Sequence, residues 1–240
     1  MARRSYSFFS HKGANFRIAC SRLSAVTSEI IFQRMVLEHY ISANPLFQAA
    51  LSPVPVSESA PPIARRMSEA AKCVGVGPMA AVAGAMAEAA AKAGLRAGAS
   101  EAIVDNGGDI YIAAAEPVVI GIFSGSPNLA DSLAFRIEPE ETPLAICSSS
   151  GCMGRSFSFG SADLACVIAW DASLADAAAT FACNLVHSPD DIAATLERVA
   201  VIRGVRGAVV IKDDRIGLVG RLPRLVRQRD GIPPDFVTGL

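Results

Sequence analysis

The chain lacks a marked excess of either charge, because its 240 residues include 22 Lys and Arg and 23 Asp and Glu. A net charge of −1 argues against a surface dedicated to nucleic acid, which needs a strong positive field. Charged residues make up only 19% of the chain and hydrophobic residues 51%, and much of that apolar surplus is alanine. This composition excludes disorder of the whole chain and allows a sizeable core.

Patterned cysteines and long hydrophobic runs are also missing. None of the six cysteines forms a C-x-x-C pair, and Cys147 and Cys152 have no nearby histidine, so zinc is not indicated. Scattered thiols in a chain of this length are typical of a reducing compartment. Polar residues interrupt the basic N-terminal segment, and the longest apolar run, residues 79–91, is mostly alanine and contains Glu88. We therefore expect a cytoplasmic protein without an export signal or membrane span.

Hydrophobic periodicity predicts both helices and short strands. The expected helices are residues 27–42, 63–72, 79–92, 173–186 and 189–199. The expected strands are residues 102–104, 110–113, 118–123, 134–137, 144–147 and 164–169, followed by a closing hairpin of 205–211 and 216–220. Antiparallel runs of strands with helices between them predict an α+β fold with a largely antiparallel sheet and packed helices.

The same patterns predict one domain with two polar ends. Residues 1–24 are expected to be a partly flexible segment or a first strand pair, and residues 25–220 the domain. Residues 51–62 carry four prolines and are interpreted as an extended connector inside that domain. Residues 221–240 form a basic, proline-containing tail that we expect to be exposed.

Three segments could carry chemistry. The first is a glycine-containing turn, including Gly77, that leads into the small-residue helix at residues 79–92. Unpaired N–H groups at a helix start favour phosphate, and a helix so poor in bulk lets a ligand or another backbone approach closely. Close packing of the helix on a sheet explains the same pattern equally well.

The second segment, Asn106, Gly107, Gly108 and Asp109, lies between two predicted strands. Asn-Gly is a strong signal for a type I′ hairpin turn, which is one interpretation of it. The other is that two glycines beside a carboxylate expose a bare backbone edge, where a flat ring or a phosphate could lie. The two interpretations stand about even.

The third segment runs from Cys147 to Thr180. It contains the hydroxyl-rich loop with Ser149, Ser150 and Gly151 and ends with Asp176 and Thr180. Residues four apart lie on one helix face, so these two could offer a carboxylate and a hydroxyl to one hard cation such as Mg²⁺. Taken alone, this common spacing favours a capped or solvated helix face.

In this order the three segments resemble the ApbE-like superfamily, whose best-known members are Mg²⁺-dependent FAD:protein FMN transferases. Within it the chain most resembles a short, uncharacterised family, over roughly residues 25–220. The matching motifs are Pro-Leu-Phe at 45–47, Ala-Pro-Pro-Ile at 60–63, Val-Gly-Pro-Met-Ala-Ala-Val-Ala-Gly at 76–84, Asn-Gly-Gly-Asp-Ile-Tyr at 106–111, Ser-Ser-Gly at 149–151, Ser-Phe-Gly at 158–160 and Ala-Asp-Ala-Ala-Ala-Thr at 175–180.

The chain departs from the flavin transferases in two places. Their first helix carries a lysine–glycine pair, where this chain has Ala83 and Gly84. Their histidine-containing stretch after the Ser-Gly loop is absent here, and none of His11, His39 and His187 replaces it.

The resemblance implies an ApbE-like architecture that binds FAD or FMN and Mg²⁺. It implies metal ligation by Asp176 and Thr180, and flavin contacts from Gly77, residues 106–109 and residues 149–151. Asp109 is the candidate for a catalytic base or positioning role. The implied activity is FMN transfer to an unknown protein acceptor or other processing of a flavin dinucleotide. One alternative is a non-catalytic accessory in cofactor or one-carbon metabolism that binds a flavin or pterin-like ligand. Another is a subunit without a ligand, whose small-residue helix packs on another chain. A homo-oligomer is also possible.

Overall fold

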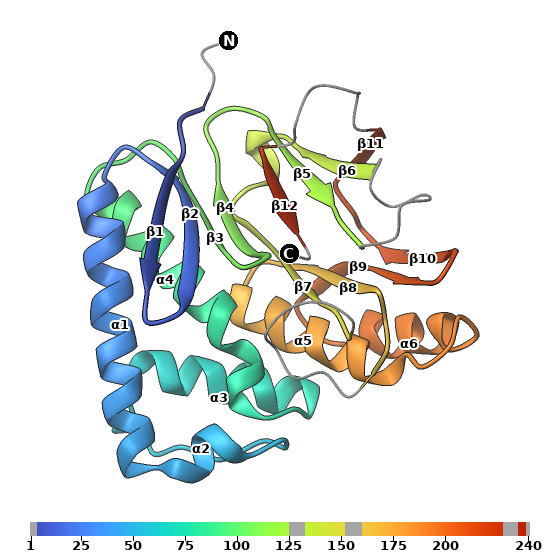
Figure 1. Ribbon diagram of the computed structural model, residues 1–240, viewed down its shortest axis with the longest axis horizontal. Coiled ribbons are helices and arrows are strands. Elements are labelled where there is room, and N and C mark those ends of the chain that lie inside the picture. Colours follow the sequence, from blue (N-terminus) through green and yellow to red (C-terminus); the bar gives the residue numbers. More distant parts are fainter. Residues whose placement is uncertain (1–3, 125–132, 152–159, 228–234, 239–240) are drawn as a thin grey trace.

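Eight strands form the central sheet of the computed structural model, which describes residues 4–124, 133–151, 160–227 and 235–238 (Figure 1). All neighbours in this sheet are antiparallel. Its order is β1 (Ser7–His11), β2 (Ala14–Cys20), β3 (Ala102–Asn106), β4 (Asp109–Ala113), β7 (Leu144–Ser149), β8 (Leu164–Ala169), β9 (Val205–Lys212) and β10 (Arg215–Gly220).

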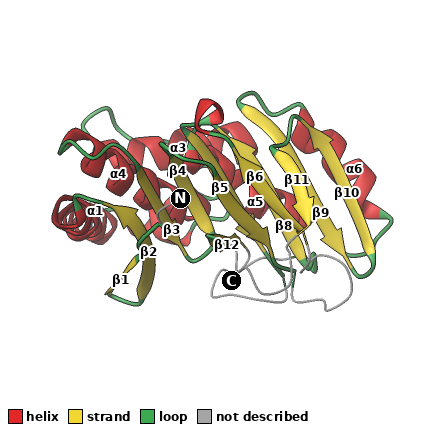
Figure 2. Ribbon diagram, turned by 90° about the horizontal axis from the view of Figure 1, so that it is seen from above, coloured by secondary structure: helices red, strands yellow, loops and turns green. Residues whose placement is uncertain are grey.

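A second sheet of four strands lies on one face of the first. Its order is β11 (Arg224–Arg227), β6 (Leu133–Ile137), β5 (Val118–Ile122) and β12 (Phe236–Thr238), with β12 parallel to β5. The helices gather on the opposite face of the central sheet, as Figure 2 shows. They are α1 (Leu23–Ala43), α2 (Pro45–Ala49), α3 (Pro62–Val74), α4 (Val82–Arg96), α5 (Ala172–Leu185) and α6 (Asp191–Ala200), with short 3₁₀ turns η1 (Pro78–Ala81) and η3 (Pro139–Glu141).

Side-chain size alternates along the central strands and separates the two cores. Successive residues of a strand point to opposite faces. In β7, Ala145 and Cys147 face the helices, whereas Leu144 and Ile146 face the small sheet. Small residues under the helices let α4 and α5 lie close to the sheet, which brings their polar side chains near the strand ends. The predicted α+β class and its antiparallel sheet are confirmed.

The described parts of the two terminal segments contain strands, and in the last segment residues 224, 225 and 227 are exposed. Residues 7–11 and 14–20 are the strand pair β1–β2, the second of the two interpretations of this segment. β11 pairs with β6 in the small sheet. Among the described residues no single helix is long and apolar enough to cross a membrane. The helix α3 and the segment Pro78–Arg96, which are bent by 106° relative to each other, reach that length and composition together.

Asp235 connects the two ends. It accepts hydrogen bonds from the Tyr6 hydroxyl at 2.5 Å and the Val119 N–H at 2.9 Å, and it lies 3.6 Å from the Arg4 guanidinium. Replacing Asp235 with alanine removes the acceptor of the two hydrogen bonds from Tyr6 and Val119, so we expect a loss of about 1–3 kcal/mol in the free energy of unfolding. Urea denaturation measures it. Asp214→Ala, an exposed turn residue, is the control, and equal unfolding midpoints for the two variants would contradict the assignment.

Candidate functional site

Asp176 of α5 accepts a hydrogen bond from the backbone of α4. Its Oδ2 lies 2.9 Å from the Gly84 nitrogen, in the first turn of α4. Ala81, which precedes α4, makes no side-chain cap, so the carboxylate of a distant helix supplies it. The pattern predicted free N–H groups here that could receive phosphate. In the structure Asp176 already occupies that position, because its negative charge suits the positive end of the helix dipole.

Gly84 allows the two helices to approach this closely. A Cβ atom at this position would lie 2.1 Å from the Ala172 carbonyl oxygen and 3.0 Å from the Asp176 Cβ. Neither atom is the end of a flexible side chain, so α4 and α5 would have to separate. The alternative of tight packing therefore accounts for this glycine of the small-residue helix.

A Gly84→Ala variant tests this close approach. In an open helix the change would stabilise the fold by about 1 kcal/mol, since alanine has the higher helix propensity. Here we expect a loss of about 1–3 kcal/mol, because the methyl group forces the backbones apart. Urea denaturation decides the sign, and a stabilised variant would contradict the crossing geometry.

The β3–β4 turn lies next to the start of α4. Gly107 and Gly108 have φ angles of 69° and 100°, as a type I′-like turn requires. The Asn106 side-chain nitrogen donates to the Ala83 carbonyl at 3.2 Å, and the Gly108 N–H donates to Asp105 at 2.8 Å. Burial raises the pKa of Asp105 to about 6. The turn interpretation is therefore correct for the backbone, and Asn106 also ties the turn to α4.

Asp109 is buried beneath the helices, close to Asp176. Its Oδ1 accepts a hydrogen bond from the Ser148 N–H at 3.3 Å. Burial and then the charge of Asp176 raise the pKa of Asp109 well above its ordinary value. Burial also raises the pKa of Asp176 to about 7, although its hydrogen bonds from Gly84 and Ala83 act in the opposite direction. Asp109 of the second predicted segment and Asp176 of the third thus lie close together in the structure.

The end of β7 forms the third side of the site. Ser149 and Ser150 are buried, and the Gly151 N–H donates to the Ala162 carbonyl at 2.9 Å. A Cβ atom at Gly151 would lie 2.1 Å from the Gly160 carbonyl oxygen, which explains the glycine by close packing. This loop leaves the sheet beside Asp109, because β7 and β4 are antiparallel neighbours.

Gly77 is placed differently from the other predicted contacts. It precedes η1, and a Cβ atom there would lie 1.9 Å from the Ala50 carbonyl oxygen. Packing against the backbone at the end of α2 explains this glycine. Thr180 lies one turn after Asp176 and is partly exposed. Residues 152–159, including Arg155 of the third segment, lie outside the described residues.

The Asp176 carboxylate and the Thr180 hydroxyl are the groups that could bind a divalent cation here, and water and phosphate would have to complete its shell. Asp109 and Asp176 are two buried carboxylates, and no Lys, Arg or His within the described ranges forms an ion pair with either. A cation would relieve their repulsion. In that part of the chain no three His, Cys, Asp or Glu side chains gather as a metal site. Mg²⁺ suits such a place, since it accepts one or two carboxylates and completes its shell with water and phosphate.

Two neighbours of the site were not singled out as candidates in the sequence. Cys147 donates from its Sγ to the Ala172 carbonyl at 3.5 Å, and burial raises its pKa well above the ordinary value. Asp105 holds the turn through Gly108. Strand alternation could have placed Cys147 on the same face as Asp109, but only with the β4–β7 register, which the sequence does not contain.

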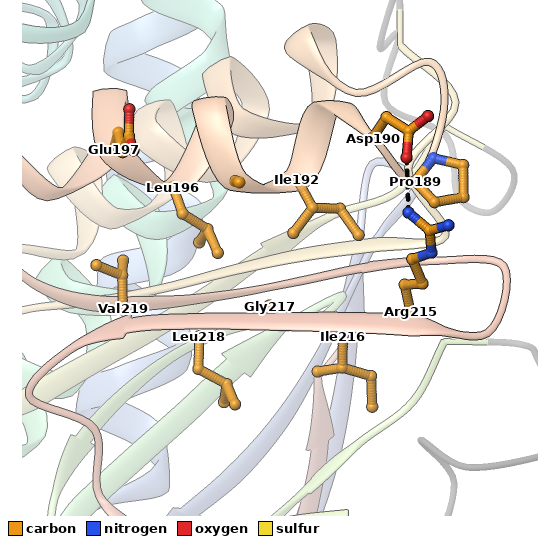
Figure 3. A pocket seen from close by; sticks show the side chains of 11 residues that line it. Pro189, Asp190, Ile192, Leu196, Glu197, Arg215, Ile216, Gly217, Leu218 and Val219 are labelled. Atoms are coloured by element: carbon orange, nitrogen blue, oxygen red, sulfur yellow. Dashed lines mark hydrogen bonds and ion pairs between the residues drawn. The ribbon is translucent and has the colours of Figure 1, made fainter.

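A separate groove of about 510 Å³ lies between α6 and β10 and shares no residue with this site (Figure 3). Ile192 and Leu196 line it from the helix, and Gly217 and Leu218 from the strand. The ion pair of Asp190 with Arg215, at 2.6 Å, stands at one end. Its apolar lining contains no buried titratable group, so the carboxylate site is the better candidate for chemistry.

Comparisons with known proteins give the family. The family model described as AbpE bacteria matches residues 10–213. The UPF0280 protein of Methanothrix thermoacetophila is 46% identical over 213 residues, which is 88% of each chain. The UPF0280 protein of Methanosarcina barkeri is 41% identical over 208 residues, covering 86% of this chain and 82% of that protein.

Solved structures agree on the fold. The ApbE protein of Thermotoga maritima matches 87% of this chain and 94% of its own, with a TM-score of 0.55 at 12% identity. The flavin transferase ApbE of Vibrio cholerae matches 90% and 96%, with a TM-score of 0.50 at 12% identity. Identities this low establish the architecture alone. With the family model and the relatives above, they show that this chain belongs to the ApbE-like UPF0280 family.

Proposed function

We propose that this protein binds a flavin dinucleotide together with Mg²⁺ and processes it, either by transferring FMN to a protein or by another cleavage of the pyrophosphate. The observation that carries the proposal is the pair of buried carboxylates, Asp109 and Asp176, between the β3–β4 turn and the start of α4. Flavin transferases share this architecture, which supports flavin as the ligand. The homologues' names state no substrate.

Each side chain has a distinct role in the proposal. Asp176 uses Oδ2 to cap α4, and because a carboxylate has two oxygens, Oδ1 can bind the cation with the Thr180 hydroxyl. When bound, Mg²⁺ would neutralise the pyrophosphate charge. Since Asp176 occupies the start of α4, we expect the phosphates to be held through the cation instead of the helix N–H groups.

Asp109 is the proposed base. Burial raises its pKa, so its ionised form is more basic than the carboxylate of an ordinary aspartate. It could take the proton of an attacking hydroxyl group, and the Ser148 N–H holds the oxygen in place. The β3–β4 turn, with its two left-handed glycines, would present a bare backbone edge to the flavin ring.

Equilibrium binding of FAD, followed by flavin fluorescence, tests this function. We expect FAD to bind about tenfold more tightly with Mg²⁺ than with chelator. Riboflavin, which lacks phosphate, is the matched control and should show no Mg²⁺ effect. Chromatography of the mixture then reports whether FMN or AMP is released. FAD affinity that is equal with Mg²⁺ and with chelator would refute the proposal.

A further inference from the structure

Glu88, in the second turn of α4, is a buried carboxylate that the proposed function does not use. Its side chain is only 3% exposed, whereas those of its partners Lys92 and Arg66 are 40% and 39% exposed. Burying an ionised carboxylate is costly unless it is paired and hydrogen-bonded. The groups that pair with Glu88 therefore show which parts of the fold this side chain connects.

Both oxygens of Glu88 are occupied. Oε1 accepts from the Lys92 ammonium group and lies 3.7 Å from the Arg66 guanidinium of α3. Oε2 accepts from the Ala172 N–H at 2.8 Å. Ala172 is the first residue of α5, so Glu88 caps the helix that carries Asp176.

The two helices consequently cap each other. Asp176 of α5 accepts from Gly84 in the first turn of α4, and Glu88 of α4 accepts from Ala172 in the first turn of α5. Between these two bonds the backbones touch at Gly84. Asp176 lies one turn beyond Ala172, so a displacement of that first turn moves the Asp176 carboxylate directly.

Glu88 also reaches the strand that carries Asp109. The Lys92 ammonium group lies 5.7 Å from the centre of the Tyr111 ring, and Tyr111 is two residues beyond Asp109 in β4. Tyr111 and Asp109 lie on the same face of that strand. Glu88 is therefore linked to α3, α5 and β4 through Arg66, Ala172 and Lys92.

We propose that Glu88 is a positioning residue, which fixes the Asp176 carboxylate for the cation by holding the first N–H of α5. The role in cation binding rests on the proposed function, whereas the role in placing Asp176 does not. Outer-shell partners of this kind typically change metal affinity about 10–100-fold when removed. Asp171 also caps α5, through the Leu174 N–H at 2.9 Å, so α5 should persist without Glu88.

The test uses two independent ways of breaking the Glu88–Ala172 bond. Glu88→Ala removes the acceptor. Ala172→Pro removes the donor while keeping the carboxylate, and proline is well tolerated at the first position of a helix. Glu88→Gln retains an oxygen that can accept the bond. Glu69→Ala, an exposed carboxylate of α3, is the matched control for loss of charge.

The primary readout is the Gly84 amide resonance in ¹H–¹⁵N NMR, because this N–H donates to Asp176. Asp176→Ala gives its position without that bond. In Glu88→Ala and Ala172→Pro we expect the resonance to move toward the Asp176→Ala position, whereas Glu88→Gln and Glu69→Ala should keep the wild-type position. A wild-type resonance in folded Glu88→Ala would overturn the proposal. If Glu88→Ala does not fold, the Ala172→Pro spectrum decides in the same way.

The second readout is the Mg²⁺-dependent tightening of FAD. We expect the Mg²⁺ concentration that gives half of this tightening to rise about tenfold in Glu88→Ala, with little change in FAD affinity in chelator. A role limited to stability would lower the melting temperature and leave both the Gly84 resonance and the Mg²⁺ effect unchanged, which would also overturn the proposal. Failure of the wild type to show any Mg²⁺ effect would remove the proposed function, and the Gly84 resonance would still decide whether Glu88 positions Asp176.

Discussion

Replacing Asp176 with asparagine is expected to abolish the Mg²⁺-dependent tightening of FAD and to leave the fold intact. The amide oxygen of asparagine can still accept the Gly84 N–H, so the cap of α4 is retained. The charge that would bind the cation is lost. Asp176→Ala removes both the charge and the hydrogen-bond acceptor. It should therefore also destabilise the protein by about 0.5–2 kcal/mol, the usual cost of a lost helix cap. FAD titrations with Mg²⁺ and with chelator, paired with urea denaturation, separate the two effects.

Asp191→Asn provides the matched control for this pair of variants. Asp191 also accepts backbone N–H groups at a helix start, those of His187 and Ser188, but it belongs to α6, away from the site. The Asp191→Asn variant should leave the Mg²⁺-dependent tightening of FAD unchanged. Thr180→Val should weaken the effect less than Asp176→Asn, because a hydroxyl group carries no charge. An Mg²⁺ effect that is the same in Asp176→Asn and the wild type would show that Asp176 binds no cation.

Stability is expected to fall as the pH rises from about 4 to 7 in chelator. The pKa of Asp176 is raised from 3.8 to about 7 in the folded protein. Between these values the folded chain retains a proton that the unfolded chain has released, so raising the pH favours unfolding. Asp105, with its pKa raised to about 6, and Asp109 act in the same direction. Because a tenfold difference in proton affinity between the folded and unfolded chains corresponds to about 1.4 kcal/mol, the combined loss should be readily measured.

Urea midpoints in chelator at pH 5 and pH 8 measure this loss. Asp176→Asn should make the pH dependence less steep, since an amide does not titrate in this range and, of the three carboxylates, only Asp105 and Asp109 remain. Mg²⁺ should stabilise the wild type more at pH 8 than at pH 5, because at pH 8 it does not compete with the bound protons. A pH dependence of the same slope in Asp176→Asn and the wild type would place the titration elsewhere.

Local patterns predicted most of the fold, and long-range pairing explains what they missed. Alternation and turn residues were sufficient for the central strands and for the closing hairpin, which the structure has as β9 and β10. The segment Arg224–Arg227 is short and basic and has the composition of an exposed tail. It is a strand only because β6, far earlier in the chain, offers it a free edge.

The contacts of the candidate site also join residues that are far apart in the sequence, so local patterns could not predict them. Spacing along one helix selected Asp176, but its partner Gly84 is 92 residues away in the sequence. The glycine-containing turn predicted open N–H groups, and only the packing of α5 on α4 shows that a carboxylate receives them. The reciprocal bond from Glu88 to Ala172 spans 84 residues and follows no local motif. Tertiary capping of this kind becomes visible only when the helices are placed.

The most direct test of the cation site is a crystal structure with FAD and Mn²⁺, using the anomalous scattering of the metal. Mn²⁺ takes oxygen ligands much as Mg²⁺ does and can be located unambiguously. We expect one anomalous peak within bonding distance of Asp176 and of a phosphate oxygen of FAD, with Oδ2 still accepting the Gly84 N–H. FAD bound without a peak at Asp176, or a peak elsewhere in the protein, would contradict the assignment of the cation to this site.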